Sequence, residues 1–153
     1  MTRKIVFPFV EKEIKALVET IEVDLLTKPR VKFTLDGKWN LSFPSEPGVY
    51  AIFEKGKFIY VGETADLRER MKDVRRTYNH TFRKKLGTQR LKAKLEDNLF
   101  SPKVEIELDN YMVKYLEFTC QALSFGRKEV EARILAKHKE LLVNSVSKRG
   151  SKK

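Results

Sequence analysis

Hydrophobic residues recur along the first part of the chain with the period of a helix and then with that of strands. Residues 10–26 place apolar side chains three and four positions apart, and Pro29 closes the run, which predicts an amphipathic helix. Residues 31–35 and 38–43 then alternate apolar and polar positions around an Asp-Gly pair, which is typical of a tight turn between antiparallel strands. We therefore expect a helix followed by a β-hairpin.

Two prolines in "FPSEPG" end this pattern and set residues 1–47 apart as an N-terminal accessory element packed on the core. Residues 48–53 and 57–62 are apolar runs on either side of "EKGK". Such a pair predicts two antiparallel strands. Thr64 follows them as the candidate cap of a helix.

The second half of the chain predicts further helices and one strand. A basic helix or helix pair is expected over residues 81–95, interrupted at Gly87. Residues 101–112 fit both a helix capped by a serine and an alternating strand, and we favour the helix. A strand within residues 114–123 and a last helix over residues 127–141 follow. The elements together predict an α/β (α+β) fold, with a small central antiparallel sheet flanked by helices.

Length and composition favour one folded domain. The chain has 153 residues, of which 41% are hydrophobic and 35% charged, enough for a core. We expect this domain to span residues 48–146, before a disordered basic tail over residues 147–153. Cys120 is the single cysteine, so no internal disulfide is expected. No apolar run approaches the ~18 residues of a membrane helix, and we expect a cytoplasmic protein without a membrane partner.

Positive charge is concentrated in one part of the sequence. The net charge is +11 and the pI is about 9.7, which favours a polyanionic partner. The window between Arg68 and Lys94 holds most of the excess. Contacts to phosphates do not distinguish DNA from RNA. The candidate nucleic-acid contacts are Arg68, Arg75, Arg76, Arg83, Lys84, Lys85 and Arg90.

Five marks in a fixed order carry candidate chemistry. The tripeptide "GVY" at 48–50 is followed by "YVG" at 60–62, and Arg70 comes ten positions after the second tyrosine. Glu131 lies in the last predicted helix and Asn144 just beyond it. In this order and spacing the chain resembles the GIY-YIG nuclease family.

The resemblance covers residues 48–144 and implies a metal-dependent endonuclease that hydrolyses phosphodiester bonds in DNA at a single site. It implies that Glu131 holds one Mg²⁺ or Mn²⁺ ion per site. It also implies that Tyr50 or Tyr60 positions and deprotonates the attacking water, while Arg70 stabilises the transition state. The implied catalytic residues are Tyr50, Tyr60, Arg70, Glu131, Asn144 and, as a candidate, His80.

Structural roles compete with these assignments. The two tyrosines are also compatible with core aromatics. Arg70 has Asp66 available for a helix ion pair at i−4. Glu129 is an alternative ligand, but Arg133 is a natural partner for it on the outer face. Glu131 borders an apolar stripe, where a carboxylate is costly unless it is paired or bound to a metal. An asparagine after a helix, like that at 144, is often a cap.

Two further residues leave alternatives open. His80 suits a proton acceptor, and some family members carry a histidine near the arginine, but a phosphate contact or a structural hydrogen bond is equally compatible. Glu63 departs from the family pattern, in which many members have a lysine or a small residue. A carboxylate there opposes phosphate binding and serves either in metal binding or in a bridge to an arginine.

The preferred substrate is DNA, with RNA not excluded, and the expected state is a monomer or weak homodimer. One site serves one strand at a time, so a double-strand cut would need dimerisation or two binding events. The alternative from another class is a catalytically weak or inactive nucleic-acid binding module with the same fold. A basic structural partner of a ribonucleoprotein is a third possibility.

Overall fold

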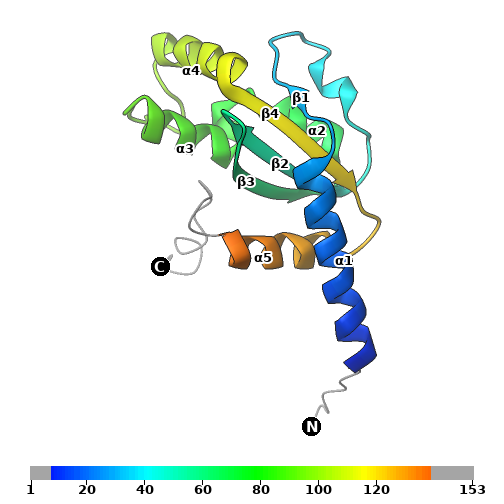
Figure 1. Cartoon of the computed structure of the whole chain (residues 1–153). Helices are drawn as coiled ribbons and strands as arrows, with labels where there is room; N and C mark the ends of the chain where they lie inside the picture. Colours follow the sequence, from blue (N-terminus) through cyan, green and yellow to red (C-terminus); the bar gives the residue numbers. More distant parts are fainter. Residues whose placement is uncertain (1–7, 139–153) are drawn as a thin grey trace.

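A four-stranded antiparallel sheet with the order β1-β4-β2-β3 forms the centre of the α+β fold (Figure 1). The computed structural model describes residues 8–138. The strands are β1 (Val31–Lys32), β2 (Gly48–Glu54), β3 (Lys57–Thr64) and β4 (Leu116–Ala122). Because β3 is an edge strand, residues from either face of the sheet can meet around it.

Helices cover both faces of this sheet (Figure 1). One face carries α1 and α5, which also contact each other, and the other carries α2, α3 and α4. No helix in this described part is long and apolar enough to cross a membrane. The α-helices are α1 (Pro8–Thr27), α2 (Leu67–Asp73), α3 (Thr81–Arg90), α4 (Pro102–Tyr115) and α5 (Arg127–His138), and the short 3-10 helices are η1 (Trp39–Ser42) and η2 (Thr77–Asn79).

The central strand β2 is buried along its whole length. Val49, Ala51 and Phe53 pack with α1 and α5, whereas Tyr50 and Ile52 point to the opposite cluster. This two-sided burial follows from the alternation of side chains along a strand. It confirms the strand pair that the two apolar runs predict, and it directs the first tyrosine to the face covered by α2 and α3.

A tight turn joins β2 to β3. Lys55 and Gly56 both have positive φ, 53° and 82°, as a type I′ turn requires. The register shifts between Ile52 and Phe53, so the bulge brings Tyr60 opposite Ile52 and onto the same face as Tyr50. The turn and the bulge therefore place the two tyrosines side by side.

The expected hairpin over residues 31–43 is wrong. Only Val31–Lys32 form a strand, and it pairs with β4, while Trp39 lies in η1. The indole N–H of Trp39 donates to the Lys32 carbonyl at 2.8 Å. Its ring centroid lies 4.9 Å from that of Phe33 and 5.0 Å from that of Phe43. These aromatic rings join the same core as Tyr50, and burying them against the sheet outweighs the local alternation.

Three helix boundaries refine the sequence predictions. The helix expected over residues 81–95 ends at Arg90, and Gly87 lies inside it, because the ring of Phe100 occupies the space that a Cβ would need, at 2.4 Å. The ambiguous segment is the helix α4, capped as expected by Ser101. Asp66, rather than Thr64, caps α2.

Candidate active site

The two tyrosines, Arg70 and His80 come together on the face of the sheet covered by α2 and α3. The rings of Tyr50 and Tyr60 are stacked with centroids 6.1 Å apart, and each lies 6.2 Å from the imidazole of His80. Tyr50, Tyr60 and His80 are 1%, 4% and 0% exposed, whereas Arg70 is half-buried. The helix α2 and the cap of α3 thus each bring one side chain to the two phenols of β2 and β3.

The glycines of both tripeptides are required by close contacts. A Cβ on Gly62 would lie 2.4 Å from the Tyr50 hydroxyl, so the phenol of the first tripeptide rests on the glycine of the second. A Cβ on Gly48 would lie 2.3 Å from the Gln121 carbonyl and 2.8 Å from Leu67. All three distances are far below van der Waals contact. The pattern of glycine and tyrosine therefore has a steric origin in this fold.

The hydrogen bonds of His80 identify its tautomer. Its Nδ1 accepts the backbone N–H of Phe82 at 3.2 Å, which caps α3. A neutral imidazole with an accepting Nδ1 carries its proton on Nε2, and that nitrogen lies 3.1 Å from the Tyr50 hydroxyl. His80 therefore donates to the Tyr50 oxygen. Of the three roles expected for His80, this geometry favours the structural hydrogen bond.

Burial and neighbouring charges keep His80 and Tyr50 neutral. Burial lowers the pKa of His80 well below its ordinary value of 6.5, and the positive charges of Arg70 and Arg83 lower it further. Burial raises the pKa of Tyr50 well above its ordinary value of 10, the neighbouring Tyr60 adds to the rise, and Arg70 opposes it. At neutral pH Tyr50 is consequently a protonated phenol and a poor base.

Arg70 extends from α2 toward this cluster. Its Nη1 donates to the Asn79 carbonyl at 3.1 Å, which holds the guanidinium against η2. The competing ion pair with Asp66 is replaced by other contacts, because the Asp66 carboxylate accepts hydrogen bonds from Ser45 and from the backbone of Glu69. Arg70 is therefore a positive charge beside two phenols rather than half of a surface ion pair.

Glu131 lies on α5, the helix that covers the other face of the sheet. It is 9% exposed on α5, where its neighbours Val130, Ile134 and Leu135 are buried against β2 and β3. The structure thus gathers four candidate residues on one face and carries the fifth on the helix across edge strand β3. Asn144, the last of the implied set, lies outside the described residues.

The start of α5 is tied to the end of β3. Arg127 Nε donates to the Glu63 carboxylate at 2.8 Å. Glu63 therefore serves in the arginine bridge, one of the two roles open to it from the sequence. Because Glu131 follows Arg127 by about one helical turn, this bridge also fixes the side of β3 on which Glu131 lies.

Glu131 offers the kind of donor that a magnesium ion takes. Carboxylate oxygens suit this hard cation, which is usually held by one or two carboxylates, substrate phosphates and water. Within the described residues no three His, Cys, Asp or Glu side chains form a group that could hold a metal. A Mg²⁺ ion held by one carboxylate keeps several waters and takes further ligands from substrate phosphates.

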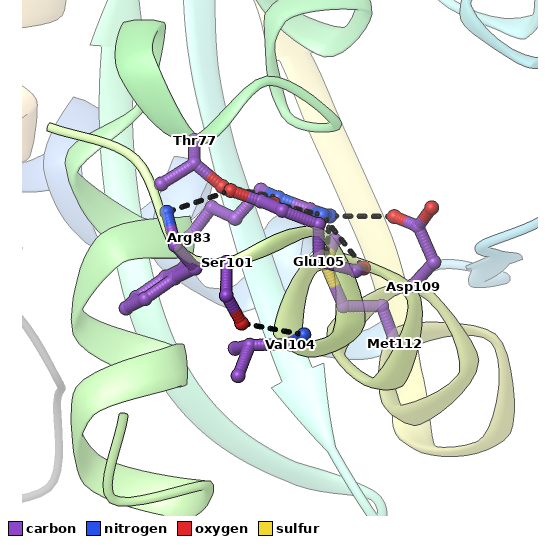
Figure 2. Close-up of polar contacts among 8 residues, drawn as sticks. Thr77, Arg83, Ser101, Val104, Glu105, Asp109 and Met112 are labelled. Carbon is purple, nitrogen blue, oxygen red and sulfur yellow. Dashed lines mark hydrogen bonds and ion pairs between the residues drawn. The ribbon is translucent and has the colours of Figure 1, made fainter. Parts of the chain in front are cut away.

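The interpretation of Arg83 as a nucleic-acid contact is wrong. Its side chain is 2% exposed and lies between α3 and α4 (Figure 2). It forms ion pairs with Glu105 at 2.9 Å and Asp109 at 2.8 Å, and its Nε donates to the Thr77 hydroxyl at 2.9 Å. Thr77 in turn donates to the Glu105 carboxylate at 2.6 Å. A guanidinium so enclosed by protein acceptors is not available to a phosphate.

This Arg83 network holds the segment that carries Asn79 and His80. Thr77 belongs to η2, and two and three positions further along the chain are Asn79, which accepts from Arg70, and His80, which donates to Tyr50. This structural role of Arg83 differs from the phosphate contact that the basic sequence window predicts. The signal available was the spacing of Glu105 and Asp109, two acids four positions apart on a helix, facing a basic segment.

The other basic candidates differ in how far protein groups engage them. Arg90 binds the Glu54 carboxylate with two hydrogen bonds, at 2.7 Å and 2.6 Å. Arg68 donates to the Phe43 carbonyl at 2.9 Å. Arg76 is exposed. Arg75 and Lys84 donate to Leu35 and Asn98 respectively, and Lys85 is half-buried. The basic window therefore presents fewer available cations than its sequence predicts.

No family model matches this chain, and no curated protein or solved structure matches it either. The resemblance accordingly rests on the order and spacing of the residues in the sequence.

Proposed function

We propose that this chain is a metal-dependent endonuclease of the GIY-YIG type, which hydrolyses phosphodiester bonds in DNA through a single site. The observation that carries the proposal is the convergence of Tyr50, Tyr60, Arg70 and His80, with the Tyr50 hydroxyl 3.1 Å from His80 and the two phenols stacked. These residues come from two strands, one helix and a helix cap. A charged guanidinium beside two phenols is unusual in a core built only for stability.

Hydrolysis requires a water oxygen to bond to phosphorus while one ester P–O bond breaks, and the departing oxygen leaves as a hydroxyl after taking up a proton. Arg70 stabilises the negative charge that develops on the phosphate oxygens. Glu131 would hold Mg²⁺ or Mn²⁺, which supplies further charge neutralisation when bound. The proposal thus assigns charge stabilisation to two groups, Arg70 and a cation at Glu131.

The two tyrosines have different roles in this proposal. The Tyr50 oxygen accepts the His80 N–H, and its raised pKa keeps the phenol protonated. We assign Tyr50 to orienting its neighbours and Tyr60, on the edge strand, to positioning the attacking water. Tyr60 also stacks on Tyr50, so the first phenol fixes the orientation of the second.

The substrate class follows from charge. The net charge of +11 favours a polyanion, and the exposed Arg76 and half-buried Lys84 and Lys85 lie in the sequence after α2. Phosphate contacts of this kind make binding strongly dependent on salt. DNA is the proposed substrate, and RNA has the same phosphate chemistry.

A specific observation favours a second candidate function. Tyr50 and Tyr60 are 1% and 4% exposed, so a phosphodiester reaches them only if the surface around them opens on binding. A chain that keeps this cluster closed would be a nucleic-acid binding module without useful catalysis. Cleavage, rather than binding, separates the two functions.

Supercoiled plasmid is the suitable first substrate because a single nick changes its mobility. Wild-type protein should nick it with Mg²⁺ or Mn²⁺ and leave it intact with chelator. Glu131→Ala should abolish nicking while Glu129→Ala, which removes an exposed carboxylate from the same helix, should retain it. An RNA oligonucleotide is tested in parallel. If both the plasmid and the RNA are bound but neither is cut, the nuclease is rejected and the binding module is favoured.

A further inference from the structure

A cavity on the far side of α2 has the chemistry of a nucleotide site. It encloses about 340 Å³ between η1 and α2, the range of small-ligand pockets. Its lining includes Trp39, Asn40, Met71, Lys72, Arg75 and Arg76. The segment that carries η1 contacts α2, and both are part of the same aromatic and aliphatic core.

Cations dominate the rim of this cavity. Lys72 and Arg76 are exposed, and Arg75 is half-buried. Arg75 Nη1 donates to the Leu35 carbonyl at 3.1 Å, which fixes the guanidinium but uses only one of its five N–H donors. The one acidic lining residue is Asp36, whose carboxylate accepts the backbone N–H of Lys38 at 2.8 Å. The charge balance favours an anion.

Two further lining residues differ in exposure, because Trp39 is 6% exposed whereas Asn40 is half-buried. Trp39 is held by its own hydrogen bond to Lys32, so its orientation is fixed. Asn40 carries an amide that is both donor and acceptor, as required to pair with the edge of an unstacked base. A rim of cations with a polar amide beside an aromatic residue matches a phosphate and its attached base better than a phosphate alone.

The position of the cavity relates it to the tyrosine cluster. Arg70 faces the cluster and Lys72 faces the cavity, and residues two apart on a helix point to nearly opposite sides. The two places are therefore separated by roughly the 10 Å width of α2. A single strand that crosses the end of this helix can contact both.

We propose that this cavity binds an unpaired nucleotide of the nucleic acid that is cleaved at the tyrosine cluster. The inference rests on the proposed nucleic-acid function and adds a preference to it: substrates with a single-stranded or extruded nucleotide beside the cut are bound more tightly than fully paired duplex. The pocket thus reads nucleic-acid structure rather than sequence.

Trp39 is the only tryptophan of the chain, so its fluorescence reports on this cavity. The titration uses the Glu131→Ala variant with chelator present, so that the oligonucleotide is not cut during the measurement. A short single-stranded thymidine oligonucleotide should quench Trp39 at a concentration at least tenfold lower than a blunt duplex of equal length. Inorganic phosphate should need a far higher concentration, because it lacks the base.

The decisive variant removes both exposed cations, Lys72→Ala with Arg76→Ala. It should weaken single-strand binding at least tenfold and reduce the log–log salt slope by about 1.4, the value for two phosphate contacts on a single strand. Lys57→Ala with Lys103→Ala removes equal charge from exposed positions elsewhere and should change affinity less than twofold. A thermal melt of each variant verifies that it is folded.

Three results would each overturn the nucleotide site. The first is an equal loss of single-strand affinity in the two double variants. The others are quenching of Trp39 by duplex, or by inorganic phosphate, at the same concentration as by single strand. The plasmid assay reports separately on cleavage. Nicking without any Trp39 response would reject the cavity alone, whereas a Trp39 response without nicking would reject the nuclease and leave the cavity as the binding site of a module.

Discussion

Replacing Arg83 by methionine tests whether its buried ion network stabilises the fold. The substitution keeps much of the side-chain volume but removes the cation that Glu105 and Asp109 share. It also removes the Nε donor to Thr77. Two carboxylates then remain next to the buried end of α3 without their counter-charge.

The expected cost follows from the burial of the three partners. Removing one member of a buried ion pair costs about 3 to 5 kcal/mol. The Glu105 and Asp109 side chains are 25% and 24% exposed, so water compensates in part and the lower end, about 3 kcal/mol, is expected. For a chain of this size that corresponds to a fall in Tm of roughly 6–12 °C.

The pH dependence of this loss has a definite sign. Partial burial by itself raises the pKa of Glu105, but hydrogen bonds from Thr77 and Arg83 outweigh it and hold the pKa below its ordinary value of 4.5. A lowered carboxyl pKa stabilises the fold above pH 4.5, and that contribution is lost as the pH falls through the folded pKa. The gap between wild type and Arg83→Met should therefore be full at pH 7 and shrink below pH 4.5.

Thermal denaturation followed by circular dichroism measures both effects. Glu105→Gln added to Arg83→Met should recover part of the loss, because it removes one of the stranded charges. An unchanged Tm at pH 7, or a gap that widens on acidification, would refute the assignment of Arg83 to a stabilising ion network.

Other predictions concern the cluster and the basic surface. Gly62→Ala forces a Cβ to within 2.4 Å of the Tyr50 ring, so it should lower the free energy of unfolding by about 1–3 kcal/mol and slow plasmid nicking. Gly37→Ala, with no atom within 4 Å of its Cβ, should do neither. Equal nicking rates in the two variants would contradict the steric role of Gly62. Arg76→Ala should reduce the salt slope of DNA binding by about 1. Arg90→Ala loses a guanidinium already bound to Glu54 and should leave the slope nearly unchanged. Filter binding over a salt series measures both slopes, and a larger decrease in Arg90→Ala than in Arg76→Ala would contradict this prediction.

Elements with strong local patterns were predictable from the sequence. The helix α1 and the β2–β3 pair follow from apolar spacing, and the Ser-Pro start of α4 decided between a helix and a strand. These features depend on contacts within a few residues. The convergence of Tyr50 and Tyr60 on one face also requires the bulge between Ile52 and Phe53, which shifts the register of β3 and which the apolar pattern alone does not indicate.

The remaining features depend on tertiary contacts. The alternation of apolar residues around Trp39 resembles that of a strand. In the structure these apolar residues instead pack aromatic rings against β4, which is possible only once the sheet has assembled. Arg83 counts as one more positive charge in the sequence, yet two acids from α4 enclose it. Neither partner set can be inferred from residues adjacent in the chain.

Single-turnover cleavage of plasmid by Arg70→Ala at saturating protein is the most direct test of the claim that the tyrosine cluster is the hydrolytic site. In the proposed mechanism the Arg70 guanidinium stabilises the transition state, so the rate should fall about 100-fold or more while DNA affinity changes only a few-fold. Lys103→Ala, an exposed cation on another element, should cleave like wild type. Metal-dependent nicking by wild type that persists at an undiminished rate in Arg70→Ala would contradict the account.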